Sequence, residues 1–156
     1  MVEFTKYQGT GNDYLFIDGM NAERDWPYLA TRMTDRHFGV GADGIIVAVP
    51  SIKAPVRMRM FNADGSEGEM CGNGIRCFYK FVVDHGLIQQ PDGALDVETN
   101  AGILSIVPKW DGETIVGARV DMGTPILEAN RVPVDSTNTA ASNYEALNPT
   151  LVQELG

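Results

Sequence analysis

The sequence predicts an α+β fold in which short, mostly antiparallel strands accompany one central, buried helix. Two observations predict it. Short stretches with alternating or continuous apolar side chains recur through the first 122 residues, separated by turns rich in Gly, Asp and Asn. One longer stretch, residues 72–86, carries apolar side chains around most of a helical circumference, which is typical of a helix inside a domain.

In chain order, the first elements are two strands and a helix. Residues 2–8 and 14–18 lie on either side of the Gly-rich turn 9–13, so we expect a strand pair there. The helix begins after Asp25, a residue type that caps helices, and has a proline in its first turn. We expect the helix to end at Gly39, with a buried face that comprises Leu29, Met33 and Phe38.

Two strands and the central helix follow. Residues 44–49 are continuously apolar and predict a buried strand. Residues 56–61 alternate apolar with basic side chains and predict a strand with one buried and one solvent-exposed face. A polar loop, residues 62–69, then leads to the helix over residues 72–86. Its apolar positions recur at helical spacing; they are Ile75, Phe78, Tyr79 and Val82.

The last regular elements are three strands, after which the pattern fades. The strands are predicted over residues 94–99, 103–107 and 114–122. Residues 136–143 are polar and of low complexity, which is typical of a linker. We therefore expect residues 1–134 to be one domain, and residues 135–156 to be a linker with the start of a second half of a longer protein.

Composition excludes several classes of protein. Of the 156 residues, 44% are hydrophobic and 21% are charged, as in ordinary globular domains. The net charge of −9 argues against nucleic-acid partners, because binding a phosphate backbone requires clustered Lys and Arg. The longest aliphatic run, residues 45–49, is too short to cross a membrane. With two cysteines and no secretory signal visible, we expect a cytoplasmic protein with free thiols.

A literal G-x-G-x-x-G occurs at residues 39–44, and an acidic residue, Asp64, lies twenty positions beyond it. A dinucleotide site needs a strand before the glycines and a helix after them, so that the helix N-terminus meets the pyrophosphate. The predicted order here is the reverse. We interpret the motif as a tight turn from helix to strand, with a glycine at positive φ.

No metal site is expected. The soft ligands Cys71, Cys77, His37 and His85 match no zinc spacing. The loop carboxylates also fail the calcium-loop pattern; they are Asp64, Glu67 and Glu69.

Cys71 lies where the polar loop becomes the buried helix, and it is the candidate catalytic residue. Backbone N–H groups at a helix N-terminus lack intrahelical partners, and their partial positive charge stabilises a thiolate. The N–H groups of Gly72, Asn73 and Gly74 can also hold a carboxylate. That combination suits proton abstraction next to a carboxylate. The residues alone leave a second interpretation open, in which Cys71 is only a small residue at a tight turn. Cys77 is interpreted as core packing.

Four motifs in order resemble the diaminopimelate epimerase family. They are FTKYQGTGNDY at residues 4–14, RHFGVGADG at 36–44, NADGSE with MCGNGIRC across 62–77, and VDMGTP at 120–125. The resemblance covers residues 1 to about 134. It implies a curled, mostly antiparallel sheet around a central helix, present twice in the full enzyme.

The resemblance also implies an activity. The family is an isomerase of lysine biosynthesis that interconverts LL- and meso-diaminopimelate without pyridoxal phosphate or metal, so no cofactor is expected. One thiolate removes the α-proton while a second thiol delivers a proton to the opposite face. This chain would supply one cysteine, and the second would come from a C-terminal half, so we expect the chain alone to be inactive. A homodimer is a further expected assembly.

Carried over by position, the resemblance makes Cys71 the first-half acid/base. Gly72 and Asn73 would bind the substrate α-carboxylate through backbone N–H groups, and Asn12 and Asn62 would recognise its distal end. Some members carry Gln where this sequence has Gly44, so any contact of that Gln must be absent or replaced.

Two alternatives remain at this stage. One is a relative of the same two-half fold, such as a proline racemase or a phenazine-pathway isomerase. The other is a non-catalytic fragment in which Cys71 is structural and the cleft only binds an amino acid or a partner.

Overall fold

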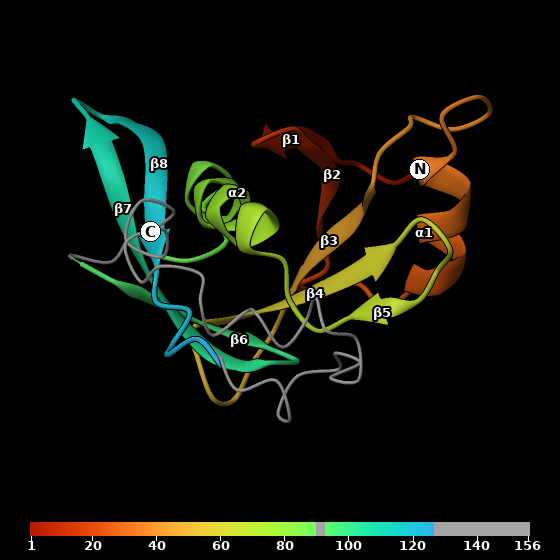
Figure 1. Ribbon diagram of the computed structural model, residues 1–156. Helices are drawn as coiled ribbons and strands as arrows, with labels where there is room; N and C mark the ends of the chain where they lie inside the picture. Colours follow the sequence, from red (N-terminus) through yellow and green to blue (C-terminus); the bar gives the residue numbers. More distant parts are fainter. Residues whose placement is uncertain (90–92, 127–156) are drawn as a thin grey trace, which may run out of the picture. The chain divides into compact units, whose positions relative to one another are not determined.

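The computed structural model, which describes residues 1–89 and 93–126, pairs the strands of this part of the chain into one mixed sheet (Figure 1). The strands are β1 (Thr5–Gly9), β2 (Asn12–Asp18), β3 (Gly44–Val49), β4 (Val56–Asn62), β5 (Glu67–Gly68), β6 (Leu95–Thr99), β7 (Gly102–Asp111) and β8 (Thr114–Val120). Their order is β1-β2-β3-β4-β6-β7-β8, with β5 beside β4. Only the β2–β3 and β4–β6 pairs are parallel among the described strands, which confirms the mostly antiparallel prediction.

The alternation of side chains along the central strands separates two apolar cores. On the face that packs against α2 (Gly72–Asp84) lie Tyr14 and Phe16 of β2, together with Ile46 of β3. On the opposite face lie Leu15, Ile17, Ile45 and Val47, in contact with α1 (Trp26–Thr34). Strands β2 and β3 are therefore buried on both faces, as the continuous apolar run at residues 44–49 predicted.

Helix α2 determines the curvature of the sheet. It contacts β1 and β8, the first and last strands in the sheet order, as well as β2, β3 and β7. Two edge strands can touch one helix only if the sheet bends around it, and Figure 1 shows α2 inside that curve. Buried apolar side chains line the helix, namely Ile75, Phe78, Tyr79, Phe81 and Val82. The predicted central helix is confirmed, ending at Asp84, two residues before Gly86.

Helix α1 lies against the other face of the sheet and is shorter than predicted. The Asp25 side chain caps it by accepting the N–H of Tyr28 at 3.0 Å. The helix ends at Thr34 because the Asp35 carboxylate accepts the N–H groups of His37 and Phe38, at 2.7 and 2.8 Å, and turns the chain away. Phe38 is 89% exposed, so the prediction that it continues the buried face was wrong.

The segment carrying the G-x-G-x-x-G motif is a turn that feeds β3, as predicted from the order of elements. Gly41 has φ +80°, a conformation that L side chains rarely adopt. The polar loop over residues 62–69 differs from the prediction in containing the short strand β5.

Residues 1–121 form one compact unit, and a second unit begins at Met122. The linker predicted over residues 135–156 lies outside the described residues. None of the described helices is long and apolar enough to cross a membrane.

Replacing Phe78 of α2 by Ala should lower the free energy of unfolding of the chain by about 3–5 kcal/mol, because Phe78 is fully buried between helix and sheet. Urea unfolding followed by circular dichroism measures the loss. Lys80→Ala on the same helix is the control. Its pair with Asp84 at 2.8 Å is at the surface, so its effect should stay within ~0.5 kcal/mol. Equal losses in the two variants would contradict a core centred on α2.

Candidate functional site

Cys71 is the N-cap of α2, where the sequence placed it. Its backbone is extended, with φ −133° and ψ 118°, and its carbonyl accepts the first helical hydrogen bond from Ile75 at 2.8 Å. Its Sγ accepts the N–H of Gly74 at 3.4 Å. The side chain is half-buried at the start of the buried helix, so the sulfur is neither enclosed in the core nor away from the helix terminus.

The first turn of α2 presents backbone donors beside this sulfur. Among the described residues, no acceptor contacts the backbone N–H of Gly72 or Asn73. A Cβ placed on Gly72 would meet none of the described atoms outside its own helical turn within 4 Å, so this side of the turn is open to the rest of the described chain. A Cβ on Gly74 would lie 2.5 Å from Cδ1 of Ile46, so that glycine lets the helix approach β3 closely. The turn can thus receive an anion from its open side.

Tyr14 of β2 also contacts the sulfur. Its phenol donates a hydrogen bond to Cys71 Sγ at 3.5 Å, and the residue is 6% exposed. Burial, and then the bond to Cys71, raise the pKa of the Tyr14 phenol well above its ordinary value. The phenol therefore stays protonated and can act as a donor to Cys71.

A chain of side-chain amides joins α2 to the β1–β2 turn. Nδ2 of Asn73 donates to Oδ1 of Asn12 at 2.9 Å, and Nδ2 of Asn12 donates to the Asp43 carboxylate at 3.1 Å. Arg76 donates to Oδ1 of Asn73 and reaches Thr10 at 3.3 Å. Two predicted site residues, Asn12 and Asn73, are thus in direct contact. The Asn73 side chain is thus held by Asn12 and Arg76, and its backbone N–H stays available at the start of α2.

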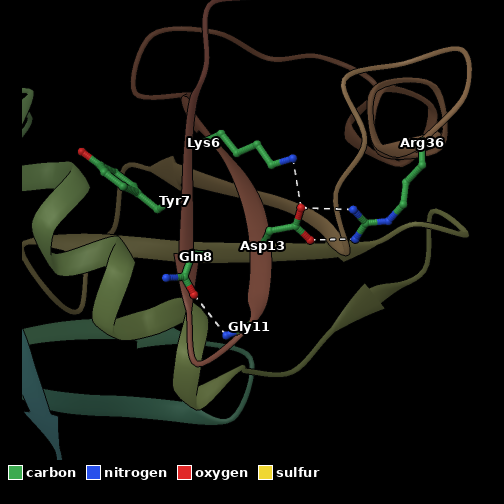
Figure 2. A pocket seen from close by; sticks show the side chains of 6 residues that line it. All are labelled: Lys6, Tyr7, Gln8, Gly11, Asp13 and Arg36. Atoms are coloured by element: carbon green, nitrogen blue, oxygen red, sulfur yellow. Dashed lines mark hydrogen bonds and ion pairs between the residues drawn. The ribbon is translucent and has the colours of Figure 1, made fainter.

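Charged side chains hold the β1–β2 turn on the side away from α2 (Figure 2). Arg36 donates twice to the Asp13 carboxylate, at 2.7 and 3.2 Å, and once to Asp43 at 2.8 Å. Lys6 lies 3.0 Å from Asp13 and donates to the carbonyl of Gly41 at 2.6 Å. The bonds from Arg36 above all, and then Lys6, hold the pKa of the Asp13 carboxyl well below its ordinary range.

A hollow of about 540 Å³ lies on this charged side, and Cys71 is not among the residues that line it. The lining residues are Lys6, Tyr7, Gln8, Gly11, Asp13 and Arg36. Figure 2 shows Lys6 and Arg36 turned toward Asp13, so their charges are already compensated. None of the predicted site residues lines this hollow, and we assign the candidate site to the N-terminus of α2 instead.

Asn62 belongs to the same face of the sheet as Tyr14. Tyr14 pairs with Gly44 on β3, and Gly44 pairs with Asn62 on β4, so the three residues form a row across the strands. Neighbouring strands are about 4.8 Å apart, which puts Asn62 roughly 10 Å from Tyr14 along that row. Asn62 is exposed, and its Nδ2 donates to Ser66 at 2.9 Å. It is therefore near the site without touching Cys71.

Gly44 leaves no room for a side chain. A Cβ there would lie 2.4 Å from the Phe61 carbonyl oxygen and 3.0 Å from the Tyr14 ring. The position that carries Gln in some members of the family is thus filled here by the approach of Tyr14 and β4.

Cys77 has a different environment from Cys71. It packs against the apolar core between α2 and the sheet and is half-buried, in agreement with the packing role expected from sequence. Burial raises the pKa of its thiol above the ordinary value. Within residues 1–89 and 93–126, no three His, Cys, Asp or Glu side chains are gathered closely enough to hold a metal ion.

Sequence reasoning missed Tyr14, Asp43 and Arg76 as parts of this site. For Tyr14 a signal was available: it lies two residues from Asn12 on one strand, so both side chains share a face. Asp43 and Arg76 gave no comparable signal, because their partners are distant in sequence.

Comparisons with known proteins show the family to which the chain belongs. The family model described as diaminopimelate epimerase matches residues 4–128. The chain is 50% identical over 134 residues to the diaminopimelate epimerase of Desulfovibrio desulfuricans, covering 85% of this chain and 46% of that protein. It is 51% identical over 137 residues to that of Desulfitobacterium hafniense, covering 85% and 48%. The chain spans about half the length of these curated relatives.

Solved structures share the fold at lower identity. A PhzF-family phenazine biosynthesis protein of Bacillus anthracis superposes with a TM-score of 0.58 at 24% identity, covering 71% of this chain and 37% of that one. A hydroxyproline epimerase of Agrobacterium vitis, solved with trans-4-hydroxy-L-proline bound, superposes with a TM-score of 0.53 at 14% identity, covering 75% and 40%. Both likenesses concern the curled sheet and its helix.

Cys71 should be alkylated by iodoacetamide roughly tenfold faster than Cys77 near neutral pH, because Cys71 is met by donors at a helix N-terminus whereas burial disfavours the Cys77 thiolate. Peptide mass spectrometry of samples quenched over time gives both rates in the same protein. Denatured chain is the control, in which the two rates should converge. A folded chain in which Cys77 reacts first would contradict the assignment.

The ion pairs of Asp13 should make the free energy of unfolding fall at acid pH. The pKa of the carboxyl is lower in the folded than in the unfolded chain, so its contribution is present above about pH 4 and is lost as the pH falls further. In Asp13→Asn the loss of unfolding free energy between neutral and acid pH should shrink, as measured by urea unfolding. Asp96→Asn, at an exposed position of β6, should leave that dependence unchanged. Parallel pH profiles for wild type and Asp13→Asn would refute the assignment.

Proposed function

The chain belongs to the diaminopimelate epimerase family, and from that membership we propose that it forms the first half of an enzyme that interconverts LL- and meso-diaminopimelate. The observation that carries the proposal is the position of Cys71. A half-buried sulfur accepts the Gly74 N–H at the start of a buried helix, and it lies beside two backbone donors that meet no acceptor within the described part of the chain. Those features support a thiolate next to a carboxylate-binding turn.

In the proposed reaction, the Cys71 thiolate removes the proton from the α-carbon of the substrate. The C–H bond breaks, an S–H bond forms on Cys71, and the electron pair moves onto the α-carboxylate. The N–H groups of Gly72 and Asn73 hold that carboxylate and stabilise the charge it gains. A thiol on the opposite face returns a proton to the carbon and becomes a thiolate, so one proton is taken and one is given. In the reverse direction the two sulfurs exchange roles.

The second thiol comes, in this proposal, from a C-terminal half. Cys77 is a poor candidate, because six residues of helix separate it from Cys71 by about 9 Å of rise and roughly 240° of rotation. Two bases on opposite faces of one carbon need to approach from different elements. The chain alone is therefore proposed to be inactive, with the C-terminal half as its partner.

Asn12 and Asn62 are proposed to recognise the distal polar end of the substrate. Asn12 already gives one amide hydrogen to Asp43 and accepts one from Asn73, which leaves one hydrogen and one lone pair for a ligand. Asn62 is exposed at the end of β4 with a neighbouring Ser66 as its partner. A ligand without the matching polar groups would leave such amides unpaired, which discriminates against it.

The test joins residues 1–126 of this chain to the second half of the Desulfovibrio desulfuricans enzyme. The chimera should epimerise diaminopimelate and exchange its α-proton with D2O by proton NMR, whereas the 156-residue chain alone should do neither. Cys71→Ala in the chimera should reduce the rate by ~10²–10⁴-fold. Cys77→Ser should stay within a few-fold of the parent, because that thiol packs in the core.

Three results would count against the proposal. Epimerisation by the 156-residue chain alone would show that it contains both acid and base. Activity that survives Cys71→Ala would show that Cys71 is not the base. Exchange of proline but not of diaminopimelate by the chimera would favour the related racemases.

A further inference from the structure

The phenol of Tyr14 has no part in the two-thiol scheme, yet it is the side-chain donor that the structure directs at the Cys71 sulfur. The oxygen lies 3.5 Å from Sγ, across 57 positions of sequence. The residue is 6% exposed, and its ring lies in the apolar core between α2 and the sheet. A phenol in such surroundings normally has a hydrogen-bond partner, and here that partner is the sulfur.

The backbone around Tyr14 accommodates the ring in this position. Strands β2 and β3 are parallel, and their register pairs Tyr14 with Gly44. Because a Cβ on Gly44 would stand 3.0 Å from the Tyr14 ring, the ring fits against a residue without a side chain. The phenol is thus directed to the N-terminus of α2 by strand pairing and packing.

Two donors with different origins then meet the sulfur. The Gly74 N–H, at 3.4 Å, is part of the helix, so the start of α2 determines its position. The Tyr14 O–H comes from the sheet, and the position of β2 determines where it lies. Together they tie one atom to both elements, which restricts the rotation of the Cys71 side chain about Cα–Cβ. A donor also binds a thiolate more strongly than a thiol, so it favours the charged form.

We propose that Tyr14 is a positioning residue for Cys71, holding its sulfur at the mouth of the α2 N-terminus and stabilising it as a thiolate. The phenol keeps its proton throughout: it donates a hydrogen bond, and no bond to its hydrogen is broken. This inference rests on the proposed function for its catalytic consequence, although its effect on the thiol can be measured without any substrate.

The test is Tyr14→Phe, which removes the hydroxyl and keeps the ring. In the 156-residue chain carrying Cys77→Ser, the rate of Cys71 alkylation by iodoacetamide is followed against pH. The pH midpoint should rise by about half a unit to one unit in Tyr14→Phe. Alkylation below the midpoint should slow by roughly three- to tenfold. Ultraviolet absorbance of the thiolate gives the same midpoint independently.

Tyr7→Phe is the matched control. It deletes another phenol from the neighbouring strand β1, one that donates to Asp84 at 3.3 Å rather than to the Cys71 sulfur. Its midpoint should equal that of the parent. Circular dichroism and the urea midpoint of each variant establish that the comparison is between folded proteins.

The chimera with the second half of the Desulfovibrio desulfuricans enzyme separates the two proposals. With Tyr14→Phe, its kcat should fall by roughly three- to tenfold below the midpoint and recover at higher pH, with KM little changed. A shifted alkylation midpoint with no epimerase activity in any chimera would support the Tyr14 inference and count against the proposed function. An unchanged alkylation midpoint in folded Tyr14→Phe would overturn the inference, whatever the activity.

Discussion

The hydrogen bond from the backbone of Gly74 to the sulfur of Cys71 is the contact on which the arrangement of the site depends. It marks where α2 begins, and α2 cannot slide along its axis without losing the packing of the sheet around it. Gly74 lets the first turn approach Ile46 of β3, where a Cβ would collide. The packing of the whole helix therefore places the backbone of Cys71, and the hydrogen bonds to the sulfur then hold its side chain.

The polar residues around this turn are held by charges that balance locally in a chain with a net charge of −9. Asp13 and Asp43 bind Arg36, and Asp43 in turn accepts from Asn12. The side-chain amide of Asn73 in turn donates a hydrogen bond to Asn12. Because each member of this network has a partner, the β1–β2 turn and the first turn of α2 keep a fixed relation. Within residues 1–89 and 93–126, the backbone N–H groups of Gly72 and Asn73 beside the sulfur have no acceptor and are available to a ligand.

The fold and the family support different conclusions. Solved structures that share the curled sheet at 24% identity or less include a phenazine biosynthesis protein and a hydroxyproline epimerase, so the fold by itself does not select a substrate. The family match is much closer, and it covers about half of each curated relative. A single sulfur on one face of a carbon cannot return a proton to the opposite face. That stereochemical requirement is why the proposal assigns the second thiol to another half.

Apart from the short strand β5, the sequence by itself determined the type and order of the described elements and the location of Cys71 at a helix start. Periodicity, the Asp25 cap and the glycines are local signals, and local signals decide such features. It failed at Phe38, where the hydrogen bonds of Asp35 end the helix early. Only the tertiary structure decided that Tyr14 reaches Cys71 and that Asn12 meets Asn73, across 57 and 61 residues of sequence. Those contacts depend on the parallel register of β2 with β3 and on the curl of the sheet around α2, which no short stretch of sequence encodes.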